Sequence, residues 1–229
     1  MEKSKRALLK YLFNPRCSDL GSKLAALRWS TYYLGSNLLI PSNVYAIYDD
    51  LGLLPEDNNR YDIFVERLIL EFGIKRNILE IGAGNIPRVA ERIAKKQIEC
   101  GMGNITVYDS YMAVKKSQYP NLTIYRKDFT LETDITDYDI LIGEYPCDAT
   151  DLMIKLALEN NKDLYIQMCG CVAPYEGMSE QEYLYYCQHP DIYRQMLINS
   201  YLEYAKKFSG KFEVSESDTA TPTLIYRHK

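Results

Sequence analysis

From Tyr61 onward, short apolar segments alternate with segments in which apolar residues have helical spacing. Five apolar segments predict strands, at Asn77–Ile81, Asn104–Tyr108, Leu122–Tyr125, Asp139–Gly143 and Leu164–Met168. Helices are expected between them, at Tyr61–Phe72, Pro87–Lys96, Tyr111–Ser117 and Thr150–Glu159. Apolar strands that are separated by helices indicate a parallel sheet covered by helices on both faces.

The alternation ends after Met168. A helical region is expected over Ser179–Phe208, with a break at His189 and Pro190. Two final strands, Lys211–Ser215 and Thr223–Arg227, are joined by a short turn-rich segment, which predicts an antiparallel hairpin. The predicted fold class is therefore α/β: a three-layer Rossmann-like sheet that is mostly parallel, with an antiparallel C-terminal hairpin strand.

The first 60 residues have a different character. Lys5–Phe13 and Ser22–Tyr33 have helical spacing, and a polar stretch at Pro55–Arg60 marks a boundary. We expect an N-terminal helical cap over 1–60 and a Rossmann-like domain over 61–229. The cap is basic, so a membrane-surface helix is the alternative, but its apolar face is short and favours a lid over the sheet.

The composition excludes several classes of protein. The 229 residues carry 27 Lys and Arg against 31 Asp and Glu, a net charge of −4, which argues against a nucleic-acid partner. No apolar run approaches the roughly 20 residues of a membrane-spanning helix, and no secretory signal is recognisable. Six irregularly spaced cysteines favour reduced thiols, and Cys169-Gly-Cys171 alone is a weak zinc signal. We expect a cytoplasmic protein with no metal and no membrane partner.

The most informative motif runs from Glu80 to Pro87, where the first strand leads through Gly82, Ala83, Gly84 and Asn85 into a helix. Glycines in such a turn let the backbone approach a ligand closely, with helix N–H groups directed at it. Glu80 either contacts the amino group of a cofactor or caps nearby backbone. The motif predicts a cofactor site that includes Pro87 and all the residues just named.

Acidic residues follow the next strands. Asp109 comes after the second strand, where a carboxylate can accept hydrogen bonds from both hydroxyls of a ribose. Asp128 and Phe129 follow the third strand, and they could accept from an adenine amine and pack on the purine ring. Glu144 and Tyr145 follow the fourth. Carboxyl ends of parallel strands are where open α/β sheets bind ligands.

The charge of these residues bears on the ligand. Pro87 stands where a dinucleotide fingerprint has its third glycine, which argues against NAD. Four acids gathered with little nearby positive charge, at Glu80, Asp109, Asp128 and Glu144, would repel a pyrophosphate. They would suit a ligand that carries a sulfonium and an ammonium group.

Over 61–229 the sequence resembles the class I S-adenosylmethionine-dependent methyltransferases. Their Glu-x-Gly-x-Gly motif matches Glu80, Gly82 and Gly84, although Ile86 replaces their third glycine. Their acids after the second and third strands match Asp109 and Asp128, and their last two strands match the expected hairpin. The resemblance implies S-adenosyl-L-methionine as cofactor, with its methionine part over Gly82–Gly84, its ribose at Asp109 and its adenine at Asp128 and Phe129.

The leading hypothesis is a methyltransferase with a small-molecule acceptor, and a protein acceptor stays open. Glu144 and Tyr145 are the candidates nearest the reacting methyl group, although Glu144-Tyr145-Pro146-Cys147 only loosely matches the motif of the family's amine methylases. His189 is expected to cap or lie at the surface, and His228 to be inert. The alternatives are a catalytically inactive binding or regulatory module and, last, a NAD-dependent oxidoreductase.

Overall fold

The structure is a computed structural model that describes residues 60–84, 86–110, 112, 114, 116–169, 172, 178–215 and 221–228. The expected N-terminal cap, Asn85 and Cys171 lie outside the described residues. The domain boundary at residue 60 therefore stays a prediction.

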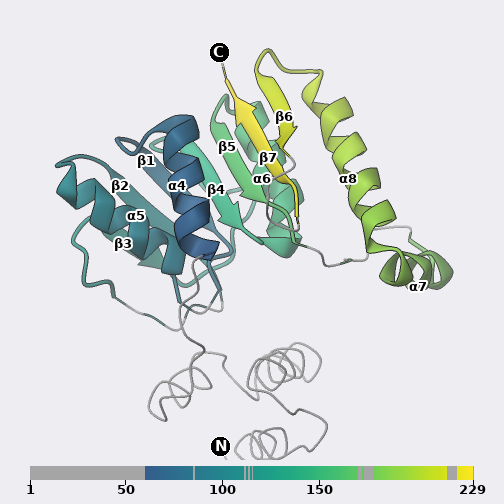
Figure 1. Ribbon diagram of the computed structural model, residues 1–229, viewed down its shortest axis with the longest axis horizontal. Coiled ribbons are helices and arrows are strands. Elements are labelled where there is room, and N and C mark those ends of the chain that lie inside the picture. The colour runs from purple at the N-terminus through teal and green to yellow at the C-terminus, as the bar shows by residue number, and fades with distance from the viewer. Residues whose placement is uncertain are drawn as a thin grey trace, which may run out of the picture.

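The described residues form a seven-stranded sheet in the order β3-β2-β1-β4-β5-β7-β6 (Figure 1). The strands are β1 (Asn77–Ile81), β2 (Asn104–Tyr108), β3 (Leu122–Tyr125), β4 (Ile140–Glu144), β5 (Asp163–Gln167), β6 (Lys211–Ser215) and β7 (Thr223–Arg227). The first five strands pair in parallel, and β7 pairs antiparallel with both β5 and β6. The Rossmann-like α/β fold and the antiparallel strand pair that the resemblance implies are confirmed.

Helices cover both faces of this sheet. They are α4 (Arg60–Phe72), α5 (Arg88–Glu99), α6 (Thr150–Glu159), α7 (Glu180–Gln188) and α8 (Pro190–Ala205), with a 3₁₀ turn η1 at Cys147–Ala149. Side chains of a strand point alternately to opposite faces. Ile78 accordingly packs in the core with α4 and α5, while Leu79 packs in the core with α6 and α8. Figure 1 shows α4 and α5 in front of the sheet.

One predicted helix is wrong. The described residues of the stretch 111–117 are not helical. Met112 is fully buried in the core with α5, and its backbone N–H donates to Asp109 O at 3.4 Å, which closes a turn. The connection from β2 to β3 is therefore anchored by a buried side chain rather than by a helical face.

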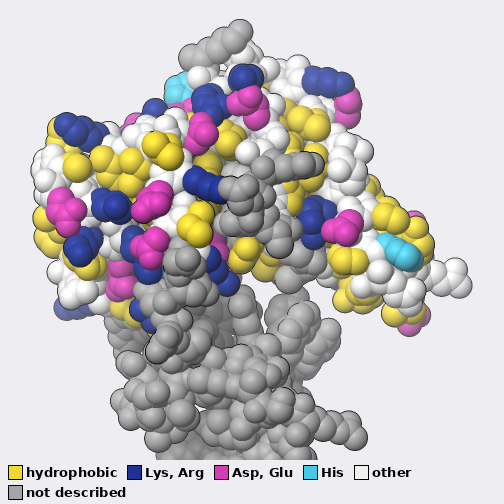
Figure 2. All heavy atoms as spheres, in the orientation of Figure 1, with side chains coloured by type: hydrophobic (Ala, Val, Ile, Leu, Met, Phe, Trp, Pro, Cys, Tyr) yellow, Lys and Arg dark blue, Asp and Glu magenta, His cyan; other side chains and the backbone are white. Residues whose placement is uncertain are grey.

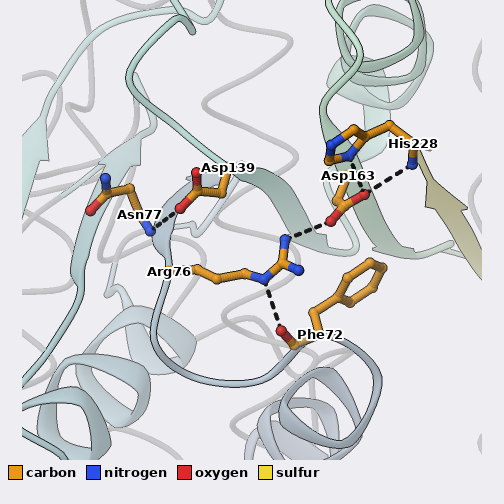
Figure 3. Close-up of polar contacts among 6 residues, drawn as sticks. All are labelled: Phe72, Arg76, Asn77, Asp139, Asp163 and His228. Atoms are coloured by element: carbon orange, nitrogen blue, oxygen red, sulfur yellow. Dashed lines mark hydrogen bonds and ion pairs between the residues drawn. The ribbon is translucent and has the colours of Figure 1, made fainter.

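Buried Asp163 organises the amino edge of the sheet, where the parallel strands begin. Its side chain accepts from Arg76 Nη1 at 2.5 Å and from the backbone N–H of His228 at 3.0 Å, and it contacts His228 Nδ1 at 2.7 Å (Figure 3). Nearby, Asp139 accepts from the backbone N–H of Asn77 at 2.8 Å. His228, expected to be inert, instead ties the end of β7 to β5.

Candidate functional site

The candidate site lies at the opposite, carboxyl edge of the sheet. There β1 and β4 are neighbours, but the chain leaves β1 towards α5 on one face and β4 towards α6 on the other. This is the point at which the strand order reverses, and α/β sheets bind ligands in the crevice it creates. The predicted residues at the ends of β1, β2 and β4 all belong to this edge.

The glycine turn after β1 has two distinct glycines. Gly82 and Gly84 both have left-handed backbone conformations, with φ of 73° and 74°. A Cβ atom on Gly82 would lie 2.8 Å from Pro146 Cα, in the loop after β4, whereas one on Gly84 would meet no described atom within 4 Å. Gly82 therefore lets two loops pack together, whereas Gly84 borders space that is clear of described atoms and in which a ligand could approach the backbone.

Asp109 is brought directly to this turn. One of its carboxylate oxygens accepts from the backbone N–H of Gly84 at 2.7 Å, so the end of β2 holds the glycine turn in place. Ala83 packs at the margin of the core shared with α4 and α5. Pro87 is buried and forms the N-cap position of α5.

Glu80 is a buried carboxyl group beneath the turn, with only 2% of its surface exposed. The backbone N–H of Ala90, in the first turn of α5, donates to it, so the predicted backbone-capping alternative is present. The other oxygen, Oε2, has no partner among the described residues. Burial, assisted by the negative charges of Glu144 and Asp109, raises the pKa of Glu80 to about 8. The group is therefore mostly protonated near neutral pH.

Glu144 is the second buried acid, at the end of β4 and 9% exposed. Its Oε1 lies 3.1 Å from Nε of Arg60, the first residue of α4. The contact is an ion pair without hydrogen-bond alignment, because Oε1 accepts no hydrogen bond from the described residues. Burial raises the pKa of Glu144, and the charge of Arg60 partly offsets that rise.

Tyr145 has an unusual backbone for a bulky residue, with φ of 58°, and Cys147 follows with φ of 49°. Such conformations cost about 1–3 kcal/mol each and are concentrated at functional sites. The backbone N–H of Tyr145 donates to Gln167 O at 2.9 Å, and its hydroxyl lies 3.4 Å from Gln167 Nε2 and 3.5 Å from Thr221 Oγ1. These contacts hold the Tyr145 ring at the carboxyl edge of the sheet.

No hydrogen bond, ion pair or ring contact among the described residues joins Asp128 or Phe129 to another predicted site residue. Asp128 is exposed, and among the described residues it makes no hydrogen bond or ion pair. Phe129 is half-buried, with its ring edge-on to Tyr108 at 6.3 Å between centroids. Their predicted role toward adenine stays a prediction.

Sequence reasoning missed three neighbours of this crevice. Arg60 was assigned to the boundary stretch and Tyr61 to the start of a helix, yet Arg60 reaches Glu144 across the sheet edge. Lys127 Nζ lies 4.8 Å from the centroid of the Tyr108 ring. One signal in the sequence could have indicated them. The motifs place four acids together without a nearby Lys or Arg, and buried acids need a compensating cation, which must then come from another part of the chain.

An open polar hollow of about 380 Å³ lies at the amino edge of the sheet, at the opposite end of the strands from the glycine turn. It is lined by Lys75, Arg76, Asp139, Asn161, Lys162 and His228. Acidic and basic side chains are interspersed over the face shown in Figure 2. Within the described ranges, we find no group of three or more potential metal-ligating side chains. No helix there has both the length and the apolar character needed to cross a bilayer.

No protein-family model matches the chain, and no curated protein matches it in sequence. Among solved structures, the plantazolicin methyltransferase BpumL in complex with SAH is 15% identical with a TM-score of 0.47, over 100% of this chain and 98% of that one. SAH-bound PaMTH1 of Podospora anserina is 12% identical with a TM-score of 0.47, over 76% and 80%. Coclaurine N-methyltransferase bound to N-methylheliamine and SAH is 16% identical with a TM-score of 0.37, over 47% of this chain and only 34% of that one. The fold assignment rests on the sheet order rather than on these likenesses.

Proposed function

We propose that this chain is an S-adenosylmethionine-dependent methyltransferase. The observation that carries the proposal is the pair of buried acids beside the glycine turn. Glu80 Oε2 and Glu144 Oε1 each accept no hydrogen bond from the described residues. Each acid therefore keeps one buried oxygen without a hydrogen-bond donor, although Ala90 donates to Glu80 and Arg60 is the ion-pair partner of Glu144. An unsatisfied buried oxygen is costly, and a positively charged ligand with N–H donors would relieve that cost. A sulfonium with an adjacent ammonium group fits such a crevice, whereas a pyrophosphate would be repelled.

The cofactor would lie across the glycine turn. The backbone of Gly82, Ala83 and Gly84, continued by Asn85 and Pro87, would pass beneath its methionine part. The space beside Gly84, which no described atom fills, supports this placement. Glu80 would face the positive groups of the cofactor.

The nucleoside would lie beyond the turn. Asp109 would hold the ribose hydroxyls, and its bond to Gly84 supports a position in the crevice. Asp128 and Phe129 would contact the adenine.

S-adenosylmethionine would supply an already activated methyl group, so the chain's task is mainly to position the acceptor in line with it. Glu144 and Tyr145 would perform this task, and their position at the end of β4 supports that role. Glu144 would also remove a proton from an acceptor that binds in its protonated form, and a raised pKa suits a base that works near neutral pH. The acceptor would be a small molecule, with a protein as the alternative.

Calorimetric titration with S-adenosylhomocysteine tests the proposal. We expect binding by the full chain, and we expect Asp109→Ala to weaken it by about 1–3 kcal/mol through loss of hydrogen bonds to the ribose. Asp137→Ala removes an exposed carboxylate elsewhere and should leave the affinity unchanged. A folded protein that does not bind S-adenosylhomocysteine refutes the proposal.

Two further titrations separate the alternatives. NADH binding in place of S-adenosylhomocysteine binding would favour an oxidoreductase. Cofactor binding without methyl transfer to any class of acceptor would favour a regulatory module.

A further inference from the structure

The Arg60 guanidinium occupies a small cage at the carboxyl edge. Its Nε lies 3.1 Å from Glu144 Oε1, and its Cζ lies 4.6 Å from the ring centroid of Tyr61 and 5.5 Å from that of Tyr145. Its Nη2 also donates to the Tyr61 hydroxyl at 2.8 Å. A carboxylate with aromatic faces around it is the chemistry by which proteins recognise ammonium and guanidinium groups.

Arg60 fills this cage incompletely. Its side chain is 45% exposed, whereas that of Glu144 is 6% exposed, so Arg60 reaches in from the surface toward a buried partner. The charge of Glu144 is matched, but the hydrogen-bonding capacity of Oε1 is not used by the described residues. A ligand cation with a well-directed N–H donor would neutralise the charge of Glu144 and also donate a hydrogen bond to Oε1.

The backbone that carries the Tyr145 ring is fixed by its surroundings. Its strained backbone, with φ of 58°, is maintained by the hydrogen bond to Gln167 and by the packing of Pro146 against Gly82 and Gly143. Strain of this kind persists only where the surroundings enforce it. The cage is therefore formed before any ligand arrives.

We propose that Glu144 and Tyr145 form the acceptor subsite, that the acceptor is a cationic nitrogen compound, either an amine or a guanidine, and that Arg60 occupies this subsite until the acceptor displaces it. The inference rests on the proposed methyltransferase function and names its substrate class. An alcohol or thiol acceptor would displace Arg60 without replacing its charge, which would leave Glu144 buried and unpaired.

The chemistry balances with the groups present and the proposed cofactor. The bound ammonium or guanidinium gives one N–H proton to the Glu144 carboxylate, which becomes a carboxylic acid. The nitrogen lone pair released in this way attacks the methyl carbon. The carbon–sulfur bond breaks with its electron pair going to sulfur, so that the products are the methylated cation and S-adenosylhomocysteine.

The test measures binding of simple cations to the full chain, with and without saturating S-adenosylhomocysteine. The probes are n-propylguanidinium and n-butylammonium, and n-propylurea is the neutral control. Arg60→Met should bind both cations at least about tenfold more tightly than the wild type, because it vacates the cage. Arg60→Lys, which keeps a cation, should show no gain, and Arg60→Met with Glu144→Gln should lose it. The neutral urea should bind equally weakly to all variants.

Several results overturn the inference: no gain in Arg60→Met, a gain that survives Glu144→Gln, or an equal gain for n-propylurea. Thermal unfolding checks that each variant is folded, and Arg60→Gln replaces Arg60→Met if the latter is not. Failure to bind S-adenosylhomocysteine refutes the proposed function, while the cation titration without it still tests the cage. Binding of S-adenosylhomocysteine without cation selectivity refutes the cationic subsite alone.

Discussion

Gly82 and Gly84 share a backbone conformation but differ in surroundings, so alanine at each position separates structural from ligand-binding roles. With φ of 73° and 74°, each position imposes a left-handed conformation that costs an L-residue about 1–2 kcal/mol. At Gly82 the new Cβ would also lie 2.8 Å from Pro146 Cα and 3.1 Å from its Cβ. Backbone cannot yield as a flexible side chain can, and overpacking of this kind adds about 1–3 kcal/mol.

We therefore expect Gly84→Ala to lower the free energy of unfolding by about 1–2 kcal/mol and Gly82→Ala by about 2–5 kcal/mol. Gly101→Ala is the matched control, because Gly101 has φ of 69°, no described atom within 4 Å of the added Cβ, and a position in the turn after α5. Urea denaturation measures the three values. In a chain of this size, each kcal/mol should lower the melting temperature by about 2–4 °C.

Binding gives the second half of the test. Gly84→Ala places a methyl group in the open space where the cofactor is proposed to lie, so it should weaken S-adenosylhomocysteine binding far more than Gly101→Ala does at equal stability. If Gly82→Ala costs no more than the other two, the close approach of Pro146 is wrong. If Gly84→Ala binds like the wild type, the space beside Gly84 is not the cofactor's.

Three further changes test the remaining polar groups. Burial raises the pKa of Glu80 from 4.5 to about 8, so the native state holds this proton more tightly than the unfolded chain does. The contribution of this proton to the free energy of unfolding is complete below pH 4.5. It is lost as the pH rises through about 8. Glu80→Gln should flatten this decline in urea unfolding between pH 5 and 9, and a wild type without any decline contradicts the reasoning. Asp163→Asn should destabilise by about 2–3 kcal/mol, less than a fully buried pair, because Arg76 is 30% exposed. Tyr201→Phe should cost about 1 kcal/mol by removing the hydrogen bond to Asp151, and an unchanged unfolding midpoint would contradict either estimate.

The sheet was predictable because its strands are apolar runs bounded by polar or turn residues, and Asn77–Ile81 and Leu122–Tyr125 have the expected bounds. The predicted start of β5 is wrong because partners that are distant in the sequence determine where this strand begins. Asp163 begins β5 although it is charged, because Arg76 and His228 compensate it from positions far away in the sequence. No local pattern reveals such a partner.

The arrangement of the candidate site residues was also partly predictable, although their roles stay predictions. Gly82, Gly84 and Asp109 were expected at one edge from their positions relative to the strands, and the structure joins Asp109 to Gly84. The contact of Arg60 with Glu144 depends on how α4 crosses the sheet, and local sequence does not determine that. The left-handed backbone of Tyr145 was likewise hidden, because no glycine marks it.

The register of β1 and β4 explains why the two buried acids act on one another. Glu80 pairs with Ile142, so Glu144 lies two residues further along the same face of the sheet. Two residues of strand and one inter-strand spacing separate their Cα atoms by about 8 Å. Two negative charges at that distance repel by about 2 kcal/mol at an effective dielectric of about 20. With Arg60 as the cation that contacts Glu144, protonation of Glu80 avoids this repulsion.

A cationic ligand beside Glu80 and Glu144 would be a second cation besides Arg60, and it would shift Glu80 from its protonated to its ionised form. This gives a prediction about the binding of the cofactor. The sulfonium of S-adenosylmethionine would favour the ionised form of Glu80, so binding at pH 7 should release close to one proton, whereas uncharged sulfur in S-adenosylhomocysteine should release a smaller fraction. Calorimetry in two buffers of different ionisation enthalpy measures the number of protons, and Glu80→Gln should abolish the release for both ligands. Equal heats in the two buffers for wild-type protein and S-adenosylmethionine would mean that Glu80 does not sense the sulfonium.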